Sequence, residues 1–239
     1  MQTDVKICGL STAETMDAAL DAGAAYVGLV FYPPSPRHLT PDAAKALAAR
    51  AVGRAEIVAL FVDPDDAEID TVVQAIAPDY IQLHGEEPPS RAAELRNRTG
   101  TKIIKAAKVA TADDIADAGR YAGCADILLF DAKAPPTASA DKSLPGGNGE
   151  TFDWSLLESR PADMDWMLSG GLNATNVAEA IASTAAPMID VSSGVERGRG
   201  IKDVAAIEKF MAAVRHADKA GDKIISSTQM TGAAADVEA

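Results

Sequence analysis

Two glycine-rich segments in the C-terminal third of the chain have the composition of an anion-binding site: LSGGLN at 168–173 and DVSSGVE at 190–196. Glycine allows the backbone to approach a ligand closely, and backbone N–H groups at the start of a helix attract phosphate. Either segment alone is better explained as a tight turn that needs glycine for its geometry. Together, each after a short apolar run, they favour a phosphate site.

Four reactive side chains lie at or after other apolar runs: Cys8, Arg37, His84 and Asp131. A thiol and a carboxylic acid can act as base and acid in proton transfer, and an arginine can bind an anionic substrate group. Each also has a plainer explanation. Free cysteines are usually buried as small hydrophobes, Asp131 can cap a helix or form an ion pair, and Arg37 is most simply a surface residue. The other two histidines have no ligand spacing relative to His84, so we expect no metal site.

Short β-rich runs alternate with longer alanine-rich, amphipathic stretches, which predicts parallel strands joined by helices. The predicted strands are Val5–Cys8, Tyr26–Phe31, Glu56–Val62, Tyr80–Leu83, Lys102–Ala106, Asp126–Phe130, Trp166–Ser169 and Met188–Val191. Helix-start signals are a capping box of Ser11 and Glu14, Thr40 before Pro41, Thr111 before two aspartates, and Asn173. Eight such units in 239 residues favour a single-domain α/β fold, the (β/α)8 TIM barrel, over an open doubly wound sheet.

Alternation of side chains along the strands predicts a buried ion pair. Lys6 shares a face with Cys8 on the first strand, and Asp190 shares a face with Ser192 on the eighth. These two strands are neighbours in a closed barrel, and a lysine inside it needs a charged partner. We therefore predict a Lys6–Asp190 pair, with Lys6 favouring the Cys8 thiolate. Cys124 precedes the sixth strand and is interpreted as a packing residue.

Composition excludes several classes of protein. The formal net charge is −13 and the pI about 4.6, which argues against a nucleic-acid binder and against docking on an anionic membrane. No run of about 18 apolar residues is present, and the N-terminus lacks the pattern of a signal peptide. With only two cysteines no disulfide framework is expected. We expect a cytoplasmic protein.

Two regions interrupt the alternation. The segment 132–149 is rich in Pro, Ala, Ser and Gly and is interpreted as a functional lid or a disordered loop. The last predicted helix is Val204–Arg215, so residues 1–216 are expected to form the barrel and residues 217–239 a flexible C-terminal tail.

The sequence resembles the phosphoribosylanthranilate isomerase family of tryptophan biosynthesis, a family of barrel enzymes. The matching segments are VKICGL, GLVFYPPSPRHLT, QLHGEE, LLFDAKAP, FDWSLL, LSGGLN and DVSSGVE, in family order from Val5 to about Arg215. The resemblance implies an Amadori rearrangement, in which an N-linked phosphoribosyl aminoaldose opens to an imine and becomes a 1-deoxyribulose ketose.

The resemblance also implies roles for individual residues. Cys8 would be the base that takes the C2′ proton, and Asp131 the acid that protonates the ring oxygen. The implied substrate-binding residues are Arg37, Gln82, His84, Gly170, Gly171, Asp190, Ser193 and Gly194. No cofactor is implied, because the iminium itself makes the C–H acidic. The expected partner is a small phosphorylated sugar–anthranilate substrate, with the chain a monomer or homodimer and with no nucleic-acid or membrane partner.

The chain departs from the family pattern at three places. Asn148 replaces a hydroxyl residue, extra residues occur around 137–144, and Arg199 stands where a proline is usual. Three alternative functions fit a barrel of this kind, and for each the sequence offers an argument against it. The histidine-pathway aminoaldose isomerase uses an aspartate where Cys8 stands, and a ribulose-phosphate epimerase needs metal ligands. A non-catalytic barrel that serves as a binding module would be expected to lose Cys8 or Asp131, whereas this sequence has both.

Overall fold

The computed structural model describes residues 2–133, 149 and 151–232, and the side chains up to residue 221. Its eight parallel strands form a closed barrel in the order β1 to β8, which confirms the predicted TIM barrel and excludes the open sheet. The strands are β1 (Asp4–Cys8), β2 (Tyr26–Val30), β3 (Glu56–Phe61), β4 (Tyr80–Leu83), β5 (Lys102–Val109), β6 (Ile127–Ala132), β7 (Asp165–Leu168) and β8 (Met188–Val191).

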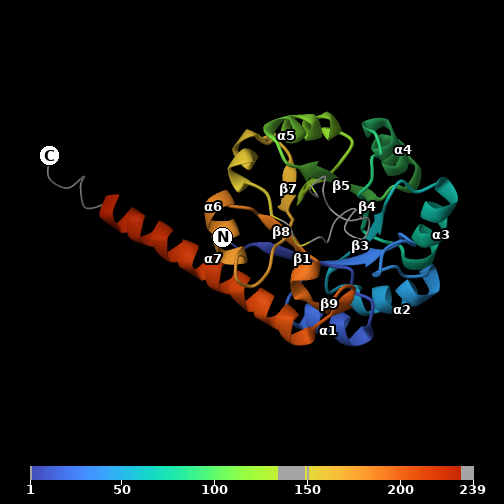
Figure 1. Cartoon of the computed structure of the whole chain (residues 1–239), viewed down its shortest axis with the longest axis horizontal. Coiled ribbons are helices and arrows are strands. Elements are labelled where there is room, and N and C mark those ends of the chain that lie inside the picture. The colour runs from blue at the N-terminus through green and yellow to red at the C-terminus, as the bar shows by residue number, and fades with distance from the viewer. Residues whose placement is uncertain (1, 134–148, 150, 233–239) are drawn as a thin grey trace.

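Helices surround the strands (Figure 1). They are α1 (Ala13–Asp21), α2 (Pro41–Ala51), α3 (Asp66–Ile76), α4 (Pro89–Thr99), α5 (Ala112–Ala118), α6 (Val177–Thr184) and α7 (Val204–Gly232). Short 3-10 segments are η1 (Gly119–Tyr121), η3 (Trp154–Ser159) and η4 (Ser193–Val195), and η4 leads into a hairpin of β9 (Glu196–Gly198) and β10 (Ile201–Lys202). None of the helices in the described part of the chain is long and apolar enough to cross a bilayer.

The buried side chains form two main layers, because alternate residues of each strand face opposite sides. One large apolar cluster lies between the strands and the helices. A second fills the barrel interior with residues such as Ile104, Leu129 and Met167. A small third cluster of Cys8, Val30 and Leu60 lies above it. The interior is therefore a packed core rather than a channel, and chemistry is confined to its rim.

Two of the predicted helix starts are confirmed and two are wrong. Thr40 caps α2 with Pro41 at its first position, and Thr111 forms a capping box with Asp114 on α5. The cap of α1 is Thr12, whose hydroxyl accepts from the Thr15 N–H, rather than Ser11.

The predicted start of α6 is also displaced along the chain. The helix begins at Val177 rather than after Asn173, because the Asn173 carboxamide accepts from the Thr175 N–H and forms a local turn.

The last helix is longer than predicted. It continues past Arg215 to Gly232 and extends away from the barrel in Figure 1. Its residue Asp218 accepts hydrogen bonds from the Thr3 N–H at 3.1 Å and the Thr3 hydroxyl at 2.7 Å. The beginning of the expected tail therefore contacts the segment that leads into β1. The flexibility of the remainder stays a prediction, and the segment 134–148 lies outside the described residues.

Two truncations separate these parts of the helix. Deletion from Gly221 onward should leave the melting temperature nearly unchanged. Deletion from Ala217 onward also removes the Asp218 carboxylate, a loss of about 1 kcal/mol, and should lower the melting temperature by about 2–4 °C. Thermal unfolding followed by circular dichroism measures both, and Asp218→Ala in the full chain should reproduce the second shift. Equal shifts for the two truncations would show that this contact is not stabilising.

Candidate active site at the barrel mouth

The predicted acid and base lie on the same rim of the barrel. Cys8 ends β1 and Asp131 is the penultimate residue of β6, so both are at carboxyl ends of strands. Each is only 5% exposed. In a closed barrel β1 and β6 are separated by β8 and β7, the strands that precede the glycine-rich turns. The strand order therefore places the acid and the base on either side of the predicted phosphate site.

Contacts between the turns connect this part of the rim. Gly170 has φ +92°, and a Cβ there would lie 2.7 Å from the Ala132 amide nitrogen, next to Asp131. In the same way Gly194 lies directly against the carbonyl of Leu172. The second turn also contacts the strand that carries the proposed base, because the Ser192 hydroxyl donates to the carbonyl of Cys8 at 3.1 Å. Glycine is thus required at both turns for close packing, and the two turns form one continuous surface.

The Cys8 thiol occupies a tight space. Gly28 lies opposite it on β2, where a Cβ would approach the Cys8 sulfur to 2.9 Å. Such an approach is shorter than real Cβ contacts allow, so a larger residue at position 28 would displace the sulfur. The segment GLVF therefore contributes to the site because Gly28, which has no side chain, leaves space for the Cys8 sulfur.

The predicted Lys6–Asp190 ion pair is present below Cys8. The Lys6 ammonium donates to an Asp190 oxygen at 2.8 Å, and the side chain of Lys6 is fully buried. The second Asp190 oxygen accepts from the Ser169 hydroxyl at 3.1 Å. Burial lowers the pKa of Lys6, but the Asp190 carboxylate and the nearby thiol outweigh it, so the pKa lies above its usual value.

Lys6 favours the Cys8 thiolate, as expected, but its effect is too small to bring the pKa of Cys8 below the ordinary value in the free protein. Burial is the largest influence and raises the pKa of Cys8. Lys6 and Lys202 lower it and Asp190 raises it, and the net result lies above the ordinary value. A low-dielectric environment favours the neutral thiol more than the nearby lysine favours the anion.

A short hydrogen-bonded chain leads to Asp131. The Gln82 amide nitrogen lies 2.8 Å from Nδ1 of His84, and Nε2 of His84 lies 3.3 Å from an Asp131 oxygen. All three residues are buried. An amide N–H donates, so Nδ1 accepts and the imidazole proton is on Nε2, which donates to Asp131. In this orientation the Gln82 oxygen has no hydrogen-bond partner among the described residues.

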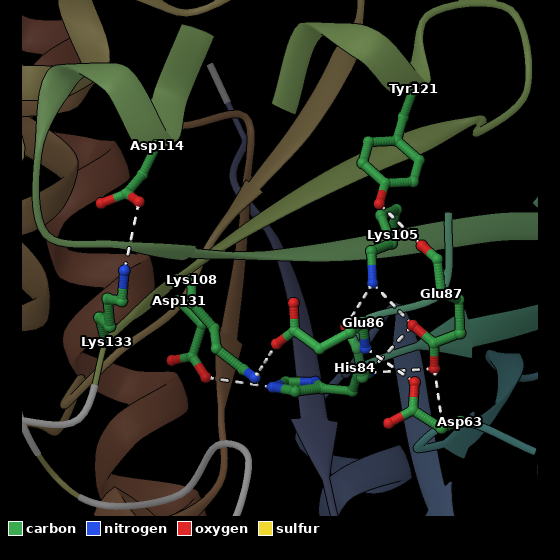
Figure 2. A network of polar contacts seen from close by, with 11 residues as sticks. Asp63, His84, Glu86, Glu87, Lys105, Lys108, Asp114, Tyr121, Asp131 and Lys133 are labelled. Carbon is green, nitrogen blue, oxygen red and sulfur yellow. Dashed lines mark hydrogen bonds and ion pairs between the residues drawn. The ribbon is translucent and has the colours of Figure 1, made fainter. Parts of the chain in front are cut away.

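Figure 2 shows a second polar group beside His84 that sequence reasoning missed. The Lys105 ammonium donates to Glu87 and to the Gly85 carbonyl, both at 2.7 Å. Glu87 in turn accepts from the Gly85 and Asp63 N–H groups. This buried pair fixes the loop after β4 that carries His84, and its only sequence signal was the second glutamate of QLHGEE.

Arg37 is buried rather than on the surface. Its Nε and Nη2 donate to the two carboxylate oxygens of Glu196 at 2.7 and 2.9 Å. Lys202 donates to the same carboxylate at 2.7 Å. Burial raises the pKa of Glu196, but these two cations outweigh it and the pKa lies below its usual value. Sequence reasoning missed Glu196 and Lys202, although both lie in or just after DVSSGVE.

Within the described residues, no group of three or more His, Cys, Asp or Glu side chains could hold a metal ion. Asn148 and the residues 137–144 lie outside the described part of the chain. Arg37, Gln82, His84 and the glycine-rich turns lie around the same mouth as Cys8 and Asp131. Asp190 lies below the mouth, where Lys6 and Ser169 occupy both of its oxygens.

Comparison with known proteins gives one consistent result. A family model described as N-(5′-phosphoribosyl)anthranilate (PRA) isomerase matches residues 5–213. The N-(5′-phosphoribosyl)anthranilate isomerase of Brucella canis is 52% identical over 218 residues, which are 91% of this chain and 96% of that protein. Phosphoribosyl anthranilate isomerase from Thermotoga maritima superposes with a TM-score of 0.77 at 32% identity, over 90% of this chain and all of the other.

A further solved structure holds a ligand. It is a phosphoribosyl anthranilate isomerase in complex with reduced 1-(o-carboxyphenylamino)-1-deoxyribulose 5-phosphate, and it has a TM-score of 0.75 at 30% identity, over 90% of this chain and all of the other. The family match over most of the chain agrees with the resemblance seen in the sequence motifs. The chain belongs to the N-(5′-phosphoribosyl)anthranilate isomerase family.

Proposed function

We propose that the protein converts N-(5′-phosphoribosyl)anthranilate to 1-(2-carboxyphenylamino)-1-deoxyribulose 5-phosphate, a step of tryptophan biosynthesis, in the cytoplasm and as a monomer or homodimer. The observation that carries the proposal is the arrangement of the rim. Cys8 and Asp131 flank two contiguous glycine-rich turns in a barrel of this family. This arrangement favours the isomerase over a non-catalytic barrel.

The proposed reaction uses an acid and a base in turn. The substrate phosphate binds at Gly170, Gly171, Ser193 and Gly194, and Arg37 binds the anthranilate carboxylate. Protonated Asp131 donates to the ring oxygen, which breaks the C1′–O bond and leaves an iminium. The Cys8 thiolate then removes the C2′ proton, and the electron pair forms the C1′–C2′ double bond of an enolamine. The enolamine tautomerises to the ketose as C1′ gains a proton and the C2′ hydroxyl loses one. The reaction is an isomerisation, so no net oxidant is needed, and the iminium itself serves as the electron sink, so no cofactor is implied.

The chain of Gln82 and His84 suits both protonation states of the acid. When the proton of Asp131 lies on the oxygen that faces the substrate, the other oxygen continues to accept from Nε2 of His84. When the proton lies on the oxygen that faces His84, it donates to Nε2 and the imidazole proton is on Nδ1. Gln82 accommodates this second tautomer by turning its amide, so that its carbonyl oxygen, unpaired among the described residues, accepts from Nδ1. We assign Gln82 and His84 this role rather than direct contact with the sugar.

Turnover of N-(5′-phosphoribosyl)anthranilate, followed by the loss of its fluorescence in the presence of excess EDTA, tests the proposal. The protein should be active without added metal. The histidine-pathway aminoaldose serves as the comparison substrate. No turnover above the rate of the uncatalysed reaction, preference for the histidine-pathway substrate, or activity that requires a divalent ion would each overturn the assignment.

The raised pKa of Cys8 gives a pH prediction for the free protein. Only the thiolate reacts with iodoacetamide, so the rate should rise about tenfold per pH unit and continue to rise beyond about pH 8.5, the ordinary thiol pKa. Mass spectrometry of Cys124→Ser, which leaves Cys8 as the only thiol, measures this rate. A rate that levels off below pH 8 would mean that Lys6 lowers the pKa of Cys8 by more than burial raises it. The thiolate would form when the cationic iminium of the substrate lies beside it.

A further inference from the structure

Arg37, Glu196 and Lys202, here called the Glu196 cluster, form a buried group of three charges beside the catalytic mouth. Their side chains are 8%, 4% and 1% exposed. The pair between Arg37 and Glu196 is bidentate and occupies Nε and Nη2 of the guanidinium. Such a pair fixes the guanidinium in one plane. A planar group held on one side presents its remaining N–H donors in a defined direction.

Glu196 is itself held from two further directions. Lys202 donates to its Oε1 at 2.7 Å, and the Gly200 N–H donates to its Oε2 at 2.9 Å. All three partners of the carboxylate belong to the described loops of the mouth. The β9–β10 hairpin, which carries Glu196 and Lys202, therefore acts as the support for an arginine that lies 159 positions earlier in the chain.

The cluster reaches Cys8 by two routes. Lys202 donates to the Ser192 carbonyl at 2.8 Å, and the Ser192 hydroxyl donates to the Cys8 carbonyl. On the other side the Arg37 stem lies against Gly9, where a Cβ would approach the Arg37 Cδ to 2.5 Å. The aliphatic stem of Arg37 is thus placed next to the residue that follows the proposed base.

The net charge of the cluster depends on all three of its side chains. A glutamate paired with Arg37 cancels its net charge, so the pair alone attracts a carboxylate less strongly than a free arginine does. Protonated Lys202, which donates to the Ser192 carbonyl and to Glu196, gives the cluster a net charge of +1. Burial lowers the pKa of Lys202 and Glu196 raises it, and the net result lies below the usual value. Orientation comes from Glu196 and the residual charge comes from Lys202, two separate contributions to binding an anion.

We propose that Glu196 is a positioning residue that aims Arg37 at the carboxylate of the aromatic ring, and that Lys202 keeps the cluster cationic. The proposal rests on the proposed function, because it assumes that Arg37 contacts the substrate. Glu196 itself touches no reacting atom. It determines specificity for a substrate that carries a carboxylate on the ring.

Two stable ligands separate this role from a structural one. The first is reduced 1-(o-carboxyphenylamino)-1-deoxyribulose 5-phosphate, and the second is the same compound without the ring carboxylate. Calorimetry should show that the wild-type protein prefers the first. In Glu196→Gln the preference should fall by about 10- to 100-fold, the range found when the hydrogen-bond partner of a ligand-binding side chain is removed at metal sites. Affinity for the second ligand should stay the same.

Lys202→Gln provides the second variant, because it removes the charge while the pair of Arg37 and Glu196 remains. It too should lose preference for the carboxylated ligand. The matched control is Arg54→Gln, which breaks an exposed ion pair with Asp21 outside the cluster and should bind both ligands as the wild type does. In turnover, Glu196→Gln should raise KM more than it lowers kcat.

The outcomes distinguish the two proposals. If Glu196→Gln folds and its preference is unchanged, or if it loses both ligands by the same factor, the positioning role is wrong. If Glu196→Gln does not fold, an unchanged preference in Lys202→Gln likewise refutes the role of the cluster, and a lost preference supports it. A wild-type protein that binds neither ligand and shows no turnover would instead overturn the proposed function.

Discussion

Cys8→Ser should lower kcat by at least about 100-fold, because a positioned general base contributes about 10²–10⁴-fold and serine is a much weaker acid than cysteine. KM should change little, because the thiol is proposed to act on the C2′ proton and not to bind the substrate. Steady-state turnover of N-(5′-phosphoribosyl)anthranilate measures both constants. Serine also fits the space above Gly28, so the variant tests chemistry rather than packing.

Asp131→Asn should have an effect of the same size for the complementary reason. The carboxamide keeps the shape of the acid but has no acidic proton to donate to the ring oxygen. Cys124→Ser is the matched control. Cys124 is buried, and its thiol donates to the Tyr121 carbonyl at 3.1 Å. A hydroxyl can make the same hydrogen bond, so activity should stay near normal. Normal kcat in Cys8→Ser together with loss in Cys124→Ser would refute the mechanism.

The second large effect concerns stability. Lys6→Met removes the ammonium that faces Asp190 at 2.8 Å and leaves a buried carboxylate with the Ser169 hydroxyl. Breaking a buried ion pair in this way costs about 3–5 kcal/mol. The melting temperature should therefore fall by roughly 10 °C. The variant Lys6→Met with Asp190→Asn should be less destabilised than the sum of the two single variants.

Denaturant unfolding of the four proteins in this cycle gives the coupling free energy. The exposed pair of Arg54 and Asp21 is the matched control, and its coupling should be below about 1 kcal/mol. Additive effects at Lys6 and Asp190 would mean that their contact adds no stability. Stability is the appropriate measurement here, because Lys6 also influences the Cys8 thiol.

The barrel strands and the Lys6–Asp190 pair could be predicted because they depend on patterns that recur along the sequence. Short β-rich runs located the eight strands of the barrel, but not the short strands β9 and β10. Parity along β1 and β8 predicts that Lys6 lies opposite Asp190, and the register of the two strands confirms it. These features follow from the period of a strand and from barrel closure. The candidate acid and base followed from strand ends together with the motifs that carry the family resemblance.

The parts that could not be predicted depend on distant partners or on burial. Arg37 reads as a surface residue until Glu196 is known to lie beside it. The direction of the Cys8 pKa depends on how completely the thiol is enclosed, which no spacing shows. The polar composition after Arg215 suggested a tail, but the last helix continues there, because no proline interrupts it. Helix length in such a segment is weakly encoded by pattern alone.

Pairing of β1 with β8 joins the first and last strands of the barrel, and Lys6 and Asp190 are 184 positions apart. Contacts of such long sequence separation carry a high loop-closure cost and slow folding. Cys8 is synthesised early, whereas the phosphate turns and Glu196 are synthesised near the end. A nascent or truncated chain that lacks β8 therefore holds the proposed base without its phosphate site. Refolding experiments should accordingly show catalytic activity returning together with closure of the barrel and not with the earlier formation of helices.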